Sequence, residues 1–399
     1  MPFTTKIKSG RRISGRKAMK KFWIIAGEAS GDIYGAALAQ ELRQIAAKNN
    51  EEIDIAGMGG KAMMEAGIRI KVDSTELGVI GIFEVLKSIF TFIKIFFYLL
   101  NEVKKERPDA VILIDYPGFN LRFAKKLYRL GIPVYWYVSP QVWVWGKKRL
   151  PILAKVCAKM LVIFPFEEEV YAKTALQAKF VGHPLVDVIA KRKDPAIVRD
   201  PNSFLLLPGS RKGEIDRLLV PMLDTVVELH KKYPDLYFTL AAPREKIAES
   251  CREKIAAYQK KYPGLPEISI VTGNTGKLQQ SAGTGLAASG TVTVECALSG
   301  LPLVVGYKLN FFTLLLARIL VKLFRGFFTM VNIIADKEVY KELLQWHFCT
   351  KEILPAVEDI LPGGKRRKEV EKDMERVASM LGSASELPAL RRAAIELYR

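Results

Sequence analysis

The sequence predicts an α/β protein with two doubly wound, Rossmann-like domains in series, each a parallel sheet covered by helices. Short apolar runs alternate with helical stretches throughout the first half of the chain. A polar, proline-containing stretch at residues 191–203 then interrupts the alternation like a linker, and the same alternation restarts after it. Ligands of such sheets bind beyond the carboxyl ends of the strands, so we expect the two sheets to face a central cleft.

Buried strands are predicted where an apolar run ends in turn residues. In the first half these runs cover residues 22–26, 110–114, 134–138 and 161–164. In the second half they cover residues 204–207, 237–241, 268–271 and 303–305. The predicted domains are therefore residues 21–190 and 200–364. They lie between a basic flexible tail at residues 1–20 and a helical segment at residues 365–399.

Composition excludes several classes of protein. With 49% hydrophobic and 26% charged residues in a chain of 399, the protein is globular and not disordered. Its four cysteines form no C-x-x-C pair, which argues against a disulfide framework or zinc site and suits the cytoplasm. The formal charge of +19 indicates an anionic partner. Because no RNP-like, zinc-finger or helix-turn-helix pattern occurs, we expect a lipid or phosphorylated substrate and no nucleic acid.

Two apolar segments, residues 78–100 and 311–328, carry charges at helical spacing that make them unsuited to span a bilayer. Such helices can lie in the headgroup plane, with rings dipped into acyl chains and cations toward lipid phosphates. The residues predicted to contact an anionic membrane surface are Phe90, Phe92, Phe96, Phe97, Arg318, Lys322 and Arg325. The alternative is that both segments are core helices whose polar stripe faces water.

Asp115 directly follows the predicted strand 110–114, and the turn Tyr116 to Asn120 should expose its carboxylate at the cleft side of the sheet. With a reference pKa near 3.9, the carboxylate is ionised unless shielded, and it can accept a proton from an attacking hydroxyl. The competing interpretation is a cap for the helix that begins close by.

Other polar residues follow strand ends of the first domain. Small residues at 27–32 allow a substrate to approach a helix N-terminus, although an ordinary strand-to-helix turn explains them equally well. His183 is either structural or catalytic. The polar residues expected to line the cleft from this domain, which the family resemblance described below makes the acceptor side, are Glu28, Ser30, Asp32, Asn120, Ser139, Gln141 and His183.

The second domain offers two tight turns between a strand and a helix, a geometry that presents backbone N–H groups to phosphate. Arg211 adds a fixed positive charge to the first turn, and Glu295 follows the second. The residues assigned to nucleotide binding are Gly209, Ser210, Arg211, Ser289, Gly290, Thr291, Glu295 and Asn332. No D-x-D pair occurs, so we expect no metal and no cofactor, with helix N-termini and Arg211 neutralising a departing diphosphate.

Several motifs occur together in order: GEASGD, GIFEVL, IDYPGFN, YVSPQVWVW, FVGHPLVD, LLPGSR and ASGTVTVE. In this combination the chain resembles the lipid-A-disaccharide synthase family from about Lys21 to its C-terminus. The resemblance implies a GT-B glycosyltransferase that joins UDP-2,3-diacylglucosamine to 2,3-diacylglucosamine 1-phosphate (lipid X) with inversion. The products would be UDP and a β-1,6-linked disaccharide.

The resemblance also implies roles for individual residues. Asp115 would be the base for the acceptor 6-hydroxyl, and Arg211, Glu295 and Asn332 would contact UDP. The enzyme would be cytoplasmic and peripheral on the inner membrane of a Gram-negative-type bacterium, with a homodimer left open. Two alternatives stay: a soluble GT-B relative such as a UDP-GlcNAc 2-epimerase, and a non-enzymatic basic protein of the membrane surface.

Overall fold

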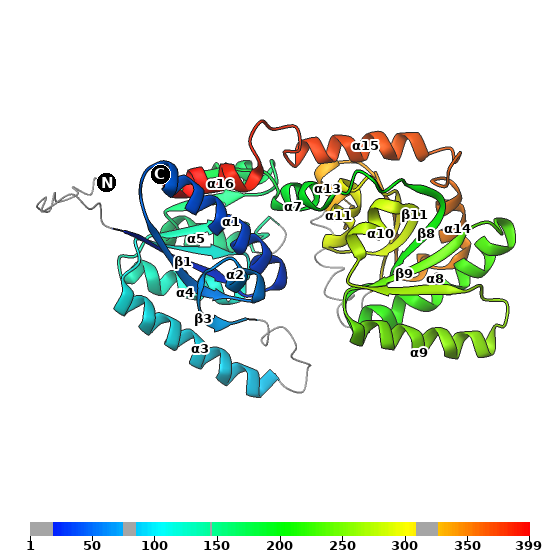
Figure 1. Cartoon of the computed structure of the whole chain (residues 1–399), viewed down its shortest axis with the longest axis horizontal. Coiled ribbons are helices and arrows are strands. Elements are labelled where there is room, and N and C mark those ends of the chain that lie inside the picture. Colours follow the sequence, from blue (N-terminus) through cyan, green and yellow to red (C-terminus); the bar gives the residue numbers. More distant parts are fainter. Residues whose placement is uncertain (1–18, 75–84, 144–145, 309–325) are drawn as a thin grey trace, which may run out of the picture. The chain divides into compact units, whose positions relative to one another are not determined.

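The computed structural model describes residues 19–74, 85–143, 146–308 and 326–399 (Figure 1). Arg318, Lys322, Arg325 and nearly all of the basic tail lie outside these ranges. The chain divides into two compact units. The first comprises Met1–Pro140, Val156–Lys159 and Ala394–Arg399, and the second comprises Gln141–Lys155 and Met160–Ala393.

The first sheet has seven strands in the order β3-β2-β1-β4-β5-β6-β7. Their bounds are β1 (Lys20–Ala26), β2 (Ile53–Gly59), β3 (Arg69–Asp73), β4 (Ala110–Ile114), β5 (Val134–Tyr137), β6 (Lys159–Val162) and β7 (Ala178–Phe180). The central strand β1 pairs in parallel with both β2 and β4. All five residues of β4 are buried aliphatic or alanine side chains, which suits a strand covered on both faces.

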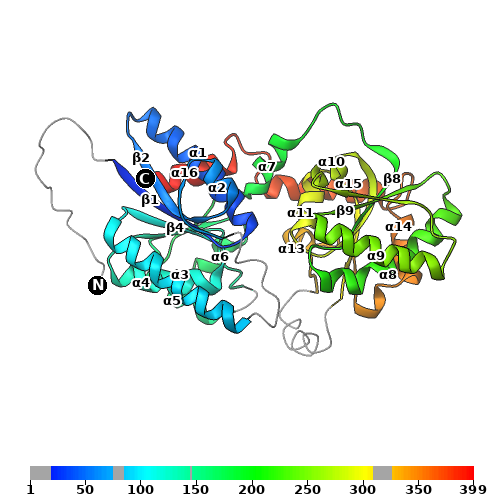
Figure 2. The same cartoon turned by 60° about the horizontal axis from the view of Figure 1, so that its bottom comes forward.

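The helices of this part of the chain are α1 (Ala29–Lys48), α2 (Lys61–Glu65), α3 (Val85–Glu106), α4 (Pro117–Arg129), α5 (Leu150–Val156), α6 (Glu167–Tyr171), α7 (Pro184–Arg192) and α16 (Ala389–Tyr398). Figures 1 and 2 show α1 on one face of the first sheet and α3 and α4 on the other. The end of α16 completes the first unit. The ring centroids of Tyr398 and Phe22 are 6.4 Å apart, and Nζ of Lys20 lies 4.0 Å from the centroid of the Tyr398 ring.

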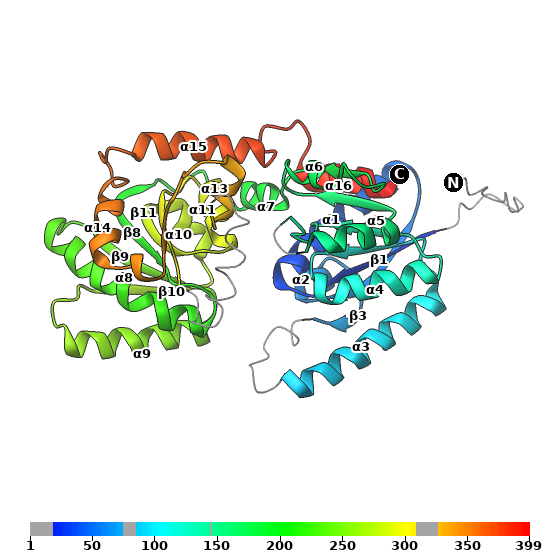
Figure 3. The same cartoon turned by 180° about the vertical axis from the view of Figure 1, so that it is seen from behind.

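The second sheet has six strands, all parallel, in the order β10-β9-β8-β11-β12-β13. Their bounds are β8 (Asp200–Leu207), β9 (Tyr237–Ala242), β10 (Ile268–Thr272), β11 (Ala282–Ala288), β12 (Leu303–Tyr307) and β13 (Lys341–Leu344). The helices are α8 (Lys212–Lys232), α9 (Glu245–Lys261), α10 (Thr275–Ser281), α11 (Thr291–Leu298), α13 (Met330–Ala335), α14 (Thr350–Glu358) and α15 (Arg367–Met380). Figure 3 shows the unit from behind, with α8 and α9 on one face of the sheet and α11 and α13 on the other.

Both sheets reverse their strand order at one point, between β1 and β4 in the first and between β8 and β11 in the second. Such switch points are where open α/β sheets bind their ligands. Two parallel α/β sheets of this kind confirm the predicted fold class. Ligand sites are therefore expected at the loops that follow β1, β4, β8 and β11.

Some predicted elements differ from the structure. Strand β8 begins at Asp200, inside the stretch predicted as a linker, and β6 begins at Lys159 and not at residue 161. Strand β11 was not predicted, because its sequence AGTGLAA has few strong strand formers. Small residues are needed there: a β-carbon on Gly283 would lie 2.7 Å from the carbonyl oxygen of Asp200 on the neighbouring strand.

Within the described residues, no helix is long and apolar enough to cross a membrane.

Candidate active site

The loop after β4 has a strained backbone. Asp115 and Tyr116 adopt left-handed conformations with φ of 44° and 49°, a region that non-glycine residues rarely enter. Each such residue costs on the order of 1 kcal/mol. The backbone N–H of Asp115 donates to the carbonyl oxygen of Tyr137 at 3.2 Å, which ties the corner to β5. Strain of this kind is concentrated at functional sites, where the surrounding structure holds it.

Asp115 does not cap the following helix. The N-cap of α4 is Tyr116, and no side chain in the described part of the chain makes a capping hydrogen bond there. Pro117 at the first helical position starts α4 instead. The cap interpretation of Asp115 is therefore wrong, and Asp115 directly follows the carboxyl end of β4.

The pKa of Asp115 is raised to about 6, first by burial and then by the negative charge of Glu28, while the backbone N–H of Tyr116 opposes the shift. Part of the side chain stays open to solvent, yet the atoms around it desolvate it strongly. The carboxyl is thus more basic than the sequence predicted and still mostly ionised at pH 7. A carboxylate with these properties suits a general base.

Asn120 holds this corner in place. Its side-chain Nδ2 donates to the carbonyl oxygens of Ile114, at 3.2 Å, and Asp115, at 2.8 Å. The residue is fully buried on the first turns of α4. Asn120, predicted as an acceptor contact, is therefore a positioning residue that fixes the backbone beneath Asp115.

The first βα junction lies against the same corner. The ring of Tyr116 packs on Gly27, where a β-carbon would come within 2.3 Å of the ring atom Cδ1. Glu28 is the exposed N-cap of α1, and Ser30 is half-buried in its first turn. Glu28 directly follows Gly27, the glycine that the Tyr116 ring covers, and Ser30 is two residues further on. The negative charge of Glu28 raises the pKa of Asp115.

Asp32 has a structural role that the sequence did not predict. Its buried carboxylate accepts hydrogen bonds from the backbone N–H groups of Gly60 at 2.7 Å, Ala62 at 2.9 Å and Met63 at 3.0 Å. A carboxylate there satisfies the first amides of α2 and opposes its positive helix end. Asp32 therefore anchors α2 to α1 and does not present its carboxylate to an acceptor.

The remaining predicted acceptor residues, His183, Ser139 and Gln141, differ in their burial and hydrogen bonding. His183 is buried, its Nδ1 accepts from the backbone N–H of Leu185 at 3.1 Å, and burial lowers its pKa to about 3. The neutral ring caps α7, so the structural interpretation of His183 holds. Ser139 is buried and donates to the carbonyl oxygen of Pro140 at 3.1 Å, whereas Gln141 is exposed.

In the second unit, the turn after β8 is closed by a side chain. Oε2 of Glu214 accepts hydrogen bonds from the backbone N–H groups of Ser210, at 2.9 Å, and Arg211, at 3.2 Å. Gly209 has φ of 115°, and a β-carbon there would meet Glu214 at 2.4 Å. The amides predicted to hold phosphate are thus already used by Glu214. Arg211 remains, with its side chain 82% exposed and its Nη1 3.6 Å from Oε1 of Glu214.

The turn after β11 is open by contrast. Gly290 is the N-cap of α11, and a β-carbon there would have no described atom within 4 Å. Thr291 is exposed, while the backbone N–H of Ser289 donates to the carbonyl oxygen of Gly306 at 3.0 Å. One turn on, Glu295 accepts from Nε2 of Gln279 at 3.3 Å. Of the two predicted turns, this is the one whose N-cap makes no side-chain capping hydrogen bond within the described residues.

Asn332 is fully buried and its amide is fully used. Its Nδ2 donates to the carbonyl oxygen of Tyr340 and to Oε1 of Glu342, both at 2.8 Å. Its Oδ1 accepts from the backbone N–H groups of Val339 and Tyr340, both at 2.9 Å. An amide has two donor hydrogens and two acceptor lone pairs, so none remains for a nucleotide. Asn332 therefore organises the loop between α13 and β13.

Helix α3 divides the predicted membrane residues into two kinds. Phe90 and Phe97 are 68% and 57% exposed. Phe92 and Phe96 are half-buried, and the ring of Phe96 lies 5.5 Å from that of Phe119 on α4. The described residues contain no group of three His, Cys, Asp or Glu side chains that could hold a metal ion.

Comparison with known proteins gives one consistent family. The lipid-A-disaccharide synthetase family matches residues 22–393. Lipid-A-disaccharide synthase of Koribacter versatilis is 36% identical over 372 residues, which cover 92% of this chain and 94% of that protein. The enzyme of the same name from Syntrophus aciditrophicus is 35% identical over 366 residues, covering 90% and 93%.

Solved structures show the same fold at low identity. UDP-GlcNAc 2-epimerase from Neisseria meningitidis, bound to UDP-GlcNAc, has a TM-score of 0.64 at 13% identity and covers 95% of this chain and 99% of that one. The glycotransferase of kitacinnamycin has a TM-score of 0.63 at 13% identity, covering 96% and 99%. These likenesses establish a GT-B-type fold. The family match and the relatives go further: the chain belongs to the lipid-A-disaccharide synthase family and is a glycosyltransferase of lipid A biosynthesis.

Proposed function

We propose that the protein joins UDP-2,3-diacylglucosamine to lipid X with inversion, giving the β-1,6-linked disaccharide 1-phosphate and UDP. The family supplies the reaction class. The observation that carries the mechanism is Asp115, a carboxylate on a strained corner whose pKa of about 6 suits it to accept a proton near neutral pH.

The proposed steps assign the acceptor to Asp115 and the departing UDP to Arg211 and Gly290. Asp115 takes the proton of the acceptor 6-hydroxyl, and the oxygen attacks the anomeric carbon of the donor. The bond between that carbon and the diphosphate oxygen breaks as the new one forms, so the anomeric configuration inverts. UDP leaves with the electron pair of the broken bond. Arg211 and the open start of α11 at Gly290 suit its negative charge.

A membrane surface is where both diacylated substrates are found. The exposed rings of Phe90 and Phe97 on α3 suit contact with acyl chains at the cytoplasmic face of the inner membrane. The charge of +19 favours an anionic lipid surface. We therefore propose peripheral binding through α3.

One assay tests the function. Purified protein is incubated with diacylated UDP-glucosamine and lipid X, and the products are separated by mass and by stereochemistry of the new bond. Formation of UDP and a β-linked disaccharide in equal amounts supports the proposal. Conversion of UDP-GlcNAc without any acceptor would indicate an epimerase instead. Binding to anionic vesicles with no consumption of UDP-sugar would indicate a non-enzymatic surface protein.

A further inference from the structure

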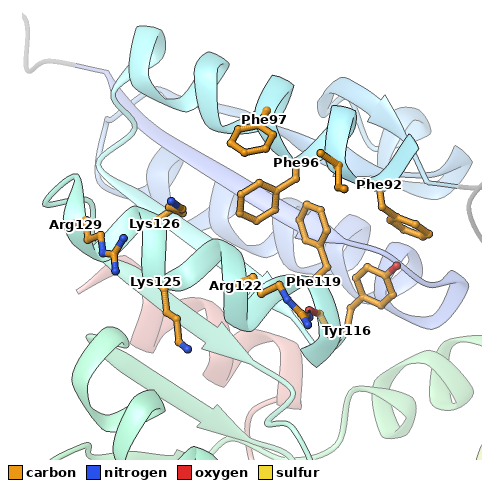
Figure 4. Close-up of a pocket in the computed structure, with 11 residues that line it drawn as sticks. Phe92, Phe96, Phe97, Tyr116, Phe119, Arg122, Lys125, Lys126 and Arg129 are labelled. Atoms are coloured by element: carbon orange, nitrogen blue, oxygen red, sulfur yellow. Dashed lines mark hydrogen bonds between the residues drawn. The ribbon is translucent and has the colours of Figure 1, made fainter. Parts of the chain in front are cut away.

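A groove of about 670 Å³ lies within the first unit, between α3 and α4 (Figure 4). Five of its lining residues are aromatic: Phe92, Phe96 and Phe97 on α3, Tyr116 at the N-cap of α4, and Phe119 on α4. Figure 4 shows the rings of Phe96 and Phe119 between the two helices. Its volume falls within the range of pockets that enclose small ligands, about 300 to 1,000 Å³. Aromatic rings of this kind suit contact with an aliphatic chain.

One side of the groove is strongly basic. The residues Arg122, Lys125, Lys126 and Arg129 line it from α4 at the spacing i, i+3, i+4 and i+7, which places them along one helix face. No acidic side chain occurs among the described residues that line the groove. Apolar walls beside a row of cations suit an amphiphile with an aliphatic tail and an anionic head.

The groove begins at the catalytic corner. Tyr116 lines it and is the residue next to Asp115. The ring of Tyr116 stacks on that of Phe119 with centroids 6.0 Å apart, and Phe119 stacks on Phe123 at 5.6 Å. A tail lying along the rings of Tyr116 and Phe119 would therefore belong to a molecule whose head is beside Asp115.

We propose that this groove holds one acyl chain of the acceptor, and that it selects acceptors by chain length. The inference rests on the proposed function, in which Asp115 deprotonates the acceptor. The acceptor is the substrate that must lie beside Asp115, and its phosphate monoester complements the cations of α4. The donor's diphosphate belongs with Arg211 and Gly290 of the second unit, so the donor is the poorer candidate for this groove.

The lining residues also distinguish an enclosed chain from contact with a bilayer. Phe92 and Phe96 are half-buried and line the groove toward α4. Phe97, which is 57% exposed, lines the groove as well, whereas Phe90, which is 68% exposed, does not. Helix α3 can thus present Phe90 to a membrane while its other face receives a single chain drawn out of that membrane.

Gly118 allows the groove to be filled without disturbing the fold. It lines the groove, and a β-carbon there would have no described atom within 4 Å. It is the second residue of α4, where leucine is a better helix former than glycine. Gly276 is a matched control: it is the second residue of α10, and a β-carbon there is equally unobstructed by described atoms.

The experiment measures kcat/KM for wild type, Gly118→Leu and Gly276→Leu. The acceptors are glucosamine 1-phosphate, which has no acyl chain, and a series of acylated acceptors of increasing chain length. All are used without vesicles and below their critical micelle concentration. For wild type we expect a gain of about fourfold per buried methylene until the groove is full. Gly118→Leu should reach its plateau at a shorter chain and lose at least tenfold on the longest acceptor. It should stay within twofold on the unacylated one, and Gly276→Leu should follow wild type throughout.

Two results would overturn the inference. One is that kcat/KM of Gly118→Leu depends on acyl-chain length as in wild type, while the variant co-sediments less with anionic vesicles. That result would make the groove a bilayer contact. The other is an equal loss on every acceptor, including the unacylated one, which would mean that leucine disturbs the Asp115 corner. If wild type forms no disaccharide with any acceptor, the proposed function fails first, and the two failures are therefore distinguishable.

Discussion

Asp115 and Glu28 are electrostatically coupled: after burial, the negative charge of Glu28 is the cause that raises the pKa of Asp115 to about 6. The two residues follow the two central strands β1 and β4, which pair in parallel and end at the same edge of the sheet. The proposed role of Asp115 links the activity, the pH profile and the stability of the protein to one carboxyl, and each link can be measured.

Replacing the proposed base should stop turnover without stopping nucleotide binding. In Asp115→Asn the side chain keeps its shape but cannot accept the hydroxyl proton. We expect kcat to fall by about 100- to 10,000-fold, the usual contribution of general base catalysis. UDP affinity, measured by calorimetry, should stay within twofold. Full activity in this variant would rule out Asp115 as the base.

The pH profile should report the same group. Because the base must be deprotonated, kcat/KM should rise with pH through an apparent pKa near 6. In Glu28→Gln the repulsion is gone, the charged form of Asp115 is favoured, and the acid limb should move to lower pH. An unchanged acid limb in Glu28→Gln would show that the limb belongs to another group.

Asp115→Asn should also stabilise the fold at neutral pH. The folded state raises the pKa of this carboxyl from 3.8 to about 6, so the folded state loses stability as pH rises through this window. An uncharged amide escapes that cost, which is up to about 3 kcal/mol at pH 7. Denaturation in urea should show a gain at pH 7 that shrinks toward pH 4. A variant that is less stable at pH 7 would contradict the raised pKa.

Arg211 should matter for the nucleotide and not for the fold. Its side chain is 82% exposed, so its ion pair with Glu214 contributes little to stability. A hydrogen bond to a charged group contributes about 1.5–3 kcal/mol. Arg211→Ala should therefore weaken UDP binding by about 10- to 100-fold at an unchanged melting temperature. Glu214→Ala, which frees the amides of Ser210 and Arg211, should lower the melting temperature as well.

Asp187 should hold the C-terminal helix. Its buried carboxylate accepts from the backbone N–H groups of Ala389 at 3.1 Å and Leu390 at 2.7 Å, which begin α16. Leaving a buried donor unpaired costs about 1–3 kcal/mol. Asp187→Ala should therefore speed amide hydrogen exchange throughout α16, and Asp187→Asn, which keeps one acceptor oxygen, should do so less. Equal exchange in wild type and Asp187→Ala would show that α16 is held by other contacts.

The sequence was sufficient for the fold class, because a strand such as β4 is a continuous buried apolar run with a turn directly after it. It was insufficient for β11, where the small residues are dictated by close approach to β8 and carry little strand propensity of their own. The exposed strand β3 was missed for a related reason, since RIKVD has no buried residue.

The sequence was enough to propose a site but not to predict its electrostatics. Asp115 could be singled out because it follows a strand, whereas its raised pKa comes from desolvation and from Glu28, which is distant in sequence. Asp32 and Asn332 have the polarity of ligand contacts, yet backbone groups distant in sequence occupy them. A polar residue near a glycine-rich turn can hydrogen-bond either to a ligand or to a backbone amide of its own chain. Which of the two it binds depends on tertiary contacts that the local sequence does not show.

The last residues of the chain complete its first unit. Tyr398 packs on Phe22 and Lys20, and Lys159 donates to the backbone carbonyl of Glu396. During translation, the ribosome makes β1 first, but Tyr398 leaves the exit tunnel only after the whole second unit has emerged. The unit with the proposed base can therefore reach its final form only after the second unit has left the exit tunnel.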